Sequence, residues 1–160
     1  MKKNILTLFG LGKTPFSATT SSLIALTIFL AVQHLSFFSF QISTAEYLSY
    51  GIHCLIAVLV FLLSIIEINK NADYASSDPK EIIVDEFLGM YCCCVIANTS
   101  GIIINLILFV LFRVIDIFKP FPFSAIEKKL NGKYGLLWDD IIIGMAIAAV
   151  YRILLFMDLL

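Results

Sequence analysis

Long apolar segments separated by short polar ones run through the whole of this 160-residue chain. Three of them, residues 21–41, 47–68 and 137–157, have about the twenty residues that a helix needs to cross a bilayer. Residues 1–20 read as an interfacial segment in which lysines lie beside leucines, and residues 43–46 as a short loop. The pattern predicts an all-α, polytopic helical membrane protein with about three full spans.

A fourth apolar segment, residues 87–112, contains Asn98-Thr99-Ser100-Gly101 at its centre. One alternative is a single tilted span with a polar kink. The other is a helical hairpin that turns at these four residues, with arms too short to span, so that it is re-entrant or packed among other helices. Only the hairpin keeps the lysines of the polar segments on one side, where the positive-inside rule places the cytoplasm. Those lysines are Lys2, Lys3, Lys13, Lys70, Lys80, Lys119, Lys128, Lys129 and Lys133. We therefore expect the hairpin.

The composition agrees with a membrane protein of one domain over residues 1–160. Hydrophobic residues make up 60% of the chain and charged residues 14%, against about 25% in soluble domains, so the charges could not cover a water-soluble surface. The net charge of −1 argues against a broad nucleic-acid-binding face. His34 and His53 both lie in apolar stretches, which argues against a histidine zinc site or a Ser-His-Asp triad.

The four cysteines also lie inside apolar segments. They are Cys54, Cys92, Cys93 and Cys94. A catalytic thiolate needs a cationic or helix-N-terminal setting, so we interpret these residues as small packing side chains.

The first of the charged patches lies between the second and fourth apolar segments. On a helix that begins after Pro79, the residues Asp78, Glu81 and Asp85 would share a face, with Glu86 on the neighbouring side. Like charges on one face repel, and a divalent cation would compensate them; ligands that are all oxygen favour Mg²⁺, Ca²⁺ or Mn²⁺. The alternative is a solvated acidic helix start, which fits the helix dipole.

A second patch places Arg113, Asp116 and Lys119 three residues apart on one helix face. Arginine and lysine can bind phosphate oxygens, while Asp116 can bind a metal ion or orient Arg113. An intrahelical ion pair with cations that reach toward the membrane surface is the alternative. Pro120 and Pro122 end this helix and lead into a lysine-rich loop.

Asp139 and Asp140 form the third patch, at the start of the last apolar segment. Adjacent helical residues point about 100° apart, so one carboxylate could bind a metal ion while the other acts as a general base or supports a ligand. Capping the helix N-terminus explains one aspartate but leaves the second without a role. A fourth patch, the hydroxyl run from Ser17 to Ser22, offers donors to an anion or simply caps the first helix.

Taken together, the patches resemble the phosphatidylglycerophosphatase A family of bacterial membrane lipid phosphatases. Three family patterns occur here in order and register: Asp78-Pro79 with Asp85-Glu86 and Gly89, then Phe112-Arg113 with Asp116, Lys119-Pro120 and Pro122, then Gly135 with Asp139-Asp140 and Gly144. An N-terminal family pattern of the type P-G-T-x-G-S is matched only at Thr19 and Ser22. Ile143 also replaces the usual alanine before Gly144.

The resemblance implies Mg²⁺-dependent hydrolysis of phosphatidylglycerophosphate to phosphatidylglycerol at the cytoplasmic face of the bacterial inner membrane. It implies metal ligands among the carboxylates and catalytic roles for four of them. The metal candidates are Asp78, Asp85, Glu86, Asp116, Asp139 and Asp140, and the catalytic candidates are Asp85, Glu86, Asp139 and Asp140. The substrate-binding candidates are Arg113, Lys119, Lys80, Thr19 and Ser22.

Two other functions remain open at this point. The chain could be a phosphatase for another lipid phosphate, because the same patches would serve any phosphate monoester. It could also be a small membrane transporter subunit or assembly protein that uses its carboxylates for cation passage. Transport predicts acids near the middle of the membrane, whereas these lie at the ends of apolar segments. The sequence does not indicate the oligomeric state.

Overall fold

The computed structural model describes residues 5–39, 44–70, 81–130 and 134–159. In these ranges the chain forms helices and no strand, which confirms the all-α prediction. The helices are η1 (Ile5–Lys13), α1 (Ser17–Ser39), α2 (Thr44–Lys70), α3 (Val84–Ala97), α4 (Ile102–Phe118), α5 (Phe123–Lys129) and α6 (Gly135–Phe156).

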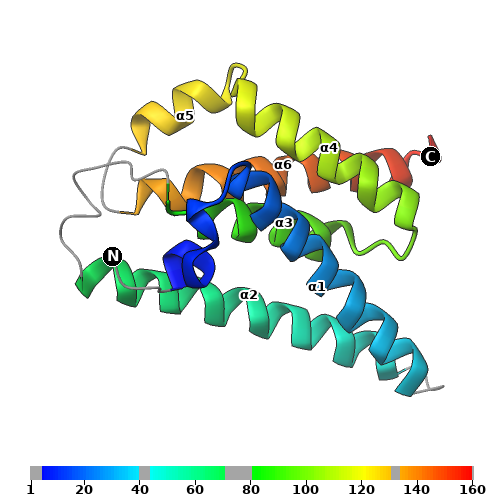
Figure 1. The fold of residues 1–160 in the computed structure, drawn as a ribbon. Coiled ribbons are helices and arrows are strands. Elements are labelled where there is room, and N and C mark those ends of the chain that lie inside the picture. The colour runs from blue at the N-terminus through cyan, green and yellow to red at the C-terminus, as the bar shows by residue number, and fades with distance from the viewer. Residues whose placement is uncertain (1–4, 40–43, 71–80, 131–133, 160) are drawn as a thin grey trace.

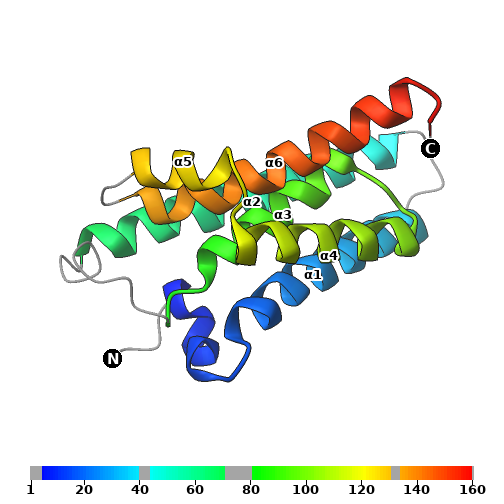
Figure 2. The same cartoon turned by 90° about the horizontal axis from the view of Figure 1, so that it is seen from above.

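The long helices lie side by side with alternating directions, as Figures 1 and 2 show. Helices α2 and α4 lie on opposite sides of the bundle, with α3 and α6 between them (Figure 1). Helix α3 packs most extensively against α6 and next against α1. The starts of α1, α3 and α6 and the ends of α2 and α4 therefore lie toward the same end of the bundle.

The predicted turn at residues 98–101 is present. Helix α3 ends at Ala97 and α4 begins at Ile102, so residues 87–112 are not one straight helix. Asn98 has a left-handed conformation (φ 45°), which ends α3. The Asn105 side chain, fully buried, donates hydrogen bonds to the carbonyl oxygens of Thr99 (2.8 Å) and Gly101 (3.1 Å). These bonds supply partners for backbone groups that a turn leaves unpaired.

Two helical stretches are long and apolar enough to cross a membrane, by length and composition alone: Ser17–Leu35 and Tyr47–Lys70. They match two of the three predicted spans. The third, residues 137–157, coincides with α6, which contains Asp139, Asp140 and Arg152 and is not one of these two stretches, so a third span is not shown. Many large apolar side chains on the outer faces of α2 and α4 are exposed in the isolated chain, among them Leu55, Leu59, Leu62, Ile103, Ile107 and Val110.

The start of α3 differs from the prediction. No helix begins just after Pro79 in the described part: residues 81–83 are non-helical, and α3 starts at Val84. The Ile83 backbone N–H donates to the Leu6 carbonyl oxygen (3.0 Å), and the Ser21 hydroxyl donates to the Ile83 carbonyl oxygen. Because these tertiary bonds hold the segment in a non-helical conformation, Glu81 does not share a helix face with Asp85.

Two predicted loops also differ. Helix α2 begins at Thr44, inside the segment expected as a loop over residues 43–46. The expected lysine-rich loop contains the short helix α5, which begins immediately after Pro122. Lys119 ends α4 in a left-handed conformation (φ 37°), which turns the chain toward α5.

Helices α3 and α6 approach closely where both carry glycine. A Cβ atom added to Gly144 would overlap the carbonyl oxygen of Gly89, and one added to Gly89 would lie 2.6 Å from the carbonyl oxygen of Asp140. Gly144 of α6 therefore lies directly against Gly89 of α3. This contact fixes the starts of α3 and α6 side by side.

Candidate active site

A cavity of about 300 Å³ opens where the starts of α1, α3 and α6 meet the end of α4 and helix α5. Its lining contains six carboxylate residues and one cationic residue, Lys119. The carboxylates are Asp85, Glu86, Asp116, Glu127, Asp139 and Asp140. The hairpin makes this convergence possible, because it returns the end of α4 to the start of α3.

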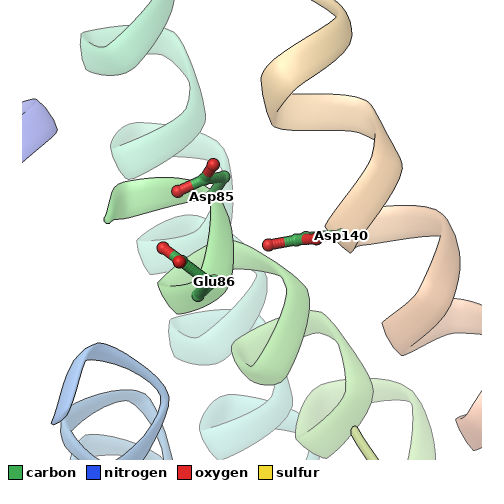
Figure 3. A group of neighbouring side chains, drawn as sticks. All are labelled: Asp85, Glu86 and Asp140. Carbon is green, nitrogen blue, oxygen red and sulfur yellow. The ribbon is translucent and has the colours of Figure 1, made fainter. Parts of the chain in front are cut away.

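Three of the carboxylates form a compact group. Asp85 and Glu86 lie in the first turn of α3, and the Asp140 side chain extends from α6 toward them, as Figure 3 shows. One oxygen from each can be chosen so that all three lie within 4.8 Å of one another. Asp85 and Asp140 are only 7% and 3% exposed. Glu86 was expected on the side of the helix next to the face of Asp85, and both residues reach this group.

The acidic group is electrostatically unbalanced. Burial raises the pKa of Asp85 well above its usual range, and the neighbouring charges of Glu86 and Asp140 raise it further. Burial also raises the pKa of Glu86. One oxygen of Asp85 and one of Glu86 are buried without a hydrogen-bond partner in the described part of the chain. Three convergent oxygen ligands with unpaired atoms fit a hard divalent cation.

Asp139 and Asp140 have different surroundings. Asp139 accepts a hydrogen bond from the Lys119 ammonium at one oxygen (2.6 Å) and from the Asp140 backbone N–H at the other (3.0 Å). Both oxygens of Asp139 are therefore engaged, while Asp140 belongs to the acidic group. The structure thus gives each aspartate of the pair a distinct contact.

Lys119 is held between two helices. Besides Asp139, its ammonium donates to Glu127 on α5 (2.9 Å). Burial lowers the pKa of Lys119, but the hydrogen bonds from Lys119 to Asp139 and Glu127 outweigh this effect and raise it. The ammonium therefore stays charged. Glu127 was missed in the sequence; the signal that could have indicated it is Pro122, a helix-start residue, five positions before it.

Arg113 and Asp116 form an ion pair on α4 at 2.6 Å, with both side chains 11% exposed. The Arg113 guanidinium also lies 3.5 Å from the Ser22 hydroxyl of α1, and its Nε has no hydrogen-bond partner in the described residues. Asp116 lines the cavity, so the pair links α1 to the acidic wall.

The family model for phosphatidylglycerophosphatase A matches residues 4–155 of the chain. The chain belongs to the phosphatidylglycerophosphatase A family. Phosphatidylglycerophosphatase A of Haemophilus influenzae is 34% identical over 106 residues, which are 64% of this chain and 61% of that protein. The Escherichia coli protein of the same name is 27% identical over 105 residues, 65% of this chain and 61% of its own length. The aligned region thus spans less than two thirds of both relatives.

The alignment with a third relative covers more of that protein's length. A Bacteroides thetaiotaomicron protein named "Putative phosphatidylinositol-3-phosphatase" is 30% identical over 140 residues, 86% of this chain and 82% of that protein. No solved structure is significantly similar to the chain. Membership of the phosphatidylglycerophosphatase A family confirms the resemblance seen in the sequence motifs.

Only some residues of the family motifs are seen to line the cavity. Asp78 and Lys80, predicted as a metal ligand and a phosphate ligand, lie outside the described residues. Thr19 and Ser22 are not among the described residues that line the cavity; Ser17 and Ala18 of the same helix are. Ser22 is fully buried and donates to the Ala18 carbonyl oxygen (3.1 Å). Its contact with Arg113 links the N-terminal hydroxyl run to the motif that contains Arg113 and Asp116.

Proposed function

We propose that this protein hydrolyses the terminal phosphate monoester of phosphatidylglycerophosphate, releasing phosphatidylglycerol and inorganic phosphate, with Mg²⁺ as cofactor. The observation that carries the proposal is the meeting of the acidic group with Lys119 in one cavity. Membership of the phosphatidylglycerophosphatase A family supports the substrate, and the names of two relatives agree with it.

In this proposal Asp85, Glu86 and Asp140 hold the divalent cation. Asp78 and Asp116 remain candidate ligands, and Asp139 acts chiefly through Lys119. A bound divalent cation would neutralise phosphate charge and lower the pKa of a water molecule. Neutralising that charge also offsets the repulsion among the three carboxylates.

The cationic side chains would bind the phosphate oxygens. Lys119 uses two of its three N–H donors on Glu127 and Asp139, which leaves one for the substrate. Arg113 would add a planar fork after exchanging part of its contact with Asp116. In the hydrolysis, the oxygen of water forms a bond to phosphorus, the ester P–O bond breaks, and the leaving alkoxide takes up a proton. One of the cavity carboxylates, among them Asp85, Glu86, Asp139 and Asp140, would accept the proton of the water.

We also propose that the protein crosses the bacterial cytoplasmic membrane with this cavity at the cytoplasmic face. The apolar outer faces of α2 and α4 suit lipid. Lysines gather at the cavity end of the bundle, at Lys13, Lys70, Lys119, Lys128 and Lys129. Short segments rich in lysine face the cytoplasm in membrane proteins. The phosphate of a lipid would then meet the cavity at the level of the headgroups.

The test is phosphate release from phosphatidylglycerophosphate by the purified protein in detergent micelles. We expect turnover with Mg²⁺, none in EDTA, and recovery when Mg²⁺ is restored in excess. The Asp85→Asn variant should lose most of the turnover, because it removes a cation ligand. Full turnover in EDTA would contradict the metal role, and no turnover with Mg²⁺ would contradict the substrate.

A second substrate is worth the same assay. The alignment with the relative named for phosphatidylinositol 3-phosphate covers 82% of that protein. Both lipids present a phosphate monoester on a hydroxylated headgroup, so the cavity chemistry serves either. If kcat/KM is higher with phosphatidylinositol 3-phosphate than with phosphatidylglycerophosphate, phosphatidylinositol 3-phosphate replaces phosphatidylglycerophosphate as the proposed substrate.

A further inference from the structure

The contact between Lys119 and Glu127 joins two segments that the sequence motifs do not connect. Glu127 lies on α5, a helix of seven residues, and it lines the cavity although it was not among the predicted site residues. In the described part of the chain, α6 is the only helix against which α5 packs, and that contact is small. The hydrogen bond from Lys119 at the end of α4 therefore ties α5 to the opposite wall of the cavity.

A lysine ammonium depends more than an arginine guanidinium on neighbouring groups that hold it in one position. Its ammonium is a point charge on a flexible four-carbon chain, and holding it in one place costs side-chain entropy. Asp139 supplies one anchor from α6 at 2.6 Å, and Glu127 supplies a second from α5 at 2.9 Å. Two anchors from different helices determine the direction of the remaining N–H, whereas one anchor would leave the ammonium free to rotate about it.

We infer that Glu127 is a positioning residue, which aims the free N–H of Lys119 at the phosphate of the substrate. The inference rests on the proposed function. The Glu127 side chain is about half exposed, so its contact is weaker than that of Asp139, whose side chain is only 12% exposed. Its effect is therefore on where the ammonium points more than on whether the protein folds.

The inference is tested by steady-state kinetics in detergent micelles on two Glu127 variants and one control variant. Glu127→Ala should raise KM for phosphatidylglycerophosphate about fivefold to tenfold, with kcat changed less, as for loss of one charge-assisted hydrogen bond. Glu127→Gln should restore KM nearly to the wild-type value, since its amide oxygen still accepts from Lys119. Lys128→Ala, which truncates an exposed side chain on the same helix, is the matched control.

A double-mutant cycle separates positioning from other roles. If Glu127 acts through Lys119, adding Glu127→Ala to a Lys119→Met variant should cause no further rise in KM. An additive rise would overturn the inference, as would a Glu127→Ala variant with unchanged KM or with a lower one. A lower KM would mean that Glu127 competes with phosphate for Lys119. Inactivity of the wild-type protein toward every lipid phosphate would instead contradict the proposed function.

Discussion

Asp139 and Asp140 are adjacent in sequence but belong to two different charge systems. A helix turns about 100° per residue, so Asp140 faces α3 and the acidic group while Asp139 faces Lys119. Substituting each in turn therefore separates the cation requirement from phosphate binding. The two substitutions are matched, because both replace one carboxylate by an amide of equal size on the same helical turn.

Asp140→Asn should increase the Mg²⁺ concentration needed for half-maximal activity by about tenfold to a hundredfold, because one ligand oxygen loses its charge. Asp139→Asn should instead raise KM for the lipid with little change in Mg²⁺ requirement. Titration of activity against Mg²⁺, at several substrate mole fractions in micelles, measures both quantities. Equal Mg²⁺ requirements in the two variants would contradict this division of roles.

The same pair gives a prediction that needs no turnover. Mg²⁺ should raise the melting temperature of the wild-type protein in detergent, because a ligand that binds only the folded state stabilises it. The Asp140→Asn variant should gain less from Mg²⁺. In EDTA it should melt higher than wild type, since the substitution removes one of three crowded carboxylates. A wild-type melting temperature that does not respond to Mg²⁺ would speak against a cation site.

At the scale of elements, the contact between α3 and α6 fixes the acidic group. Asp85 and Glu86 lie one turn before Gly89, and Asp140 lies one turn before Gly144. The two glycines allow the backbones to touch at this level. A side chain at either glycine would push the helices apart and with them the carboxylates.

Gly144→Ala should therefore lower the stability by about 1–3 kcal/mol through overpacking and reduce activity as well. Gly51→Ala is the control, because Gly51 lies in α2 and an added Cβ there meets no atom within 4 Å. That control should be neutral or slightly stabilising, since alanine is the better helix former. Thermal unfolding in detergent and phosphate release measure the two effects. Equal behaviour of both variants would contradict the close contact.

Local chemistry explains which elements could be predicted from the sequence. Asn98 and Gly101 interrupt an otherwise apolar segment, so the turn between α3 and α4 was readable. The start of α3 was not, because Ile83 bonds to Leu6, more than seventy residues earlier. Likewise, the spacing of Asp85 and Asp140 carries no signal of their contact, which depends on two glycines on separate helices. Glu127 was not predicted as a site residue because its short helix, α5, lies in a lysine-rich segment that was expected to be a loop.

At the scale of the whole molecule, one end of the bundle holds the acidic cavity, whereas the described residues at the other end include few charged ones. The cavity end holds the acidic group, Lys119 and the ends of α2 and α4. The far end holds the turn between α3 and α4 and the end of α6, where the Arg152 guanidinium donates to the Ile96 carbonyl oxygen (2.9 Å). Helix α3 has 14 residues and is about 21 Å long, too short to cross the roughly 30 Å hydrocarbon core.

This difference in charge between the two ends of the bundle predicts the topology of the hairpin. With the cavity at the cytoplasmic face, α3 enters from that side, turns at residues 98–101 within the membrane or near its far surface, and returns as α4.

Single cysteines introduced as Lys70→Cys, Lys129→Cys and Leu159→Cys, in a background whose four native cysteines are changed to alanine, report the side of the membrane on which each position lies. An impermeant thiol reagent applied to oriented vesicles should label positions 70 and 129 from the same, cytoplasmic side and position 159 from the opposite side. Labelling of positions 70 and 129 from opposite sides would contradict the hairpin, because the end of α2 and helix α5 could then not lie at the same end of the bundle.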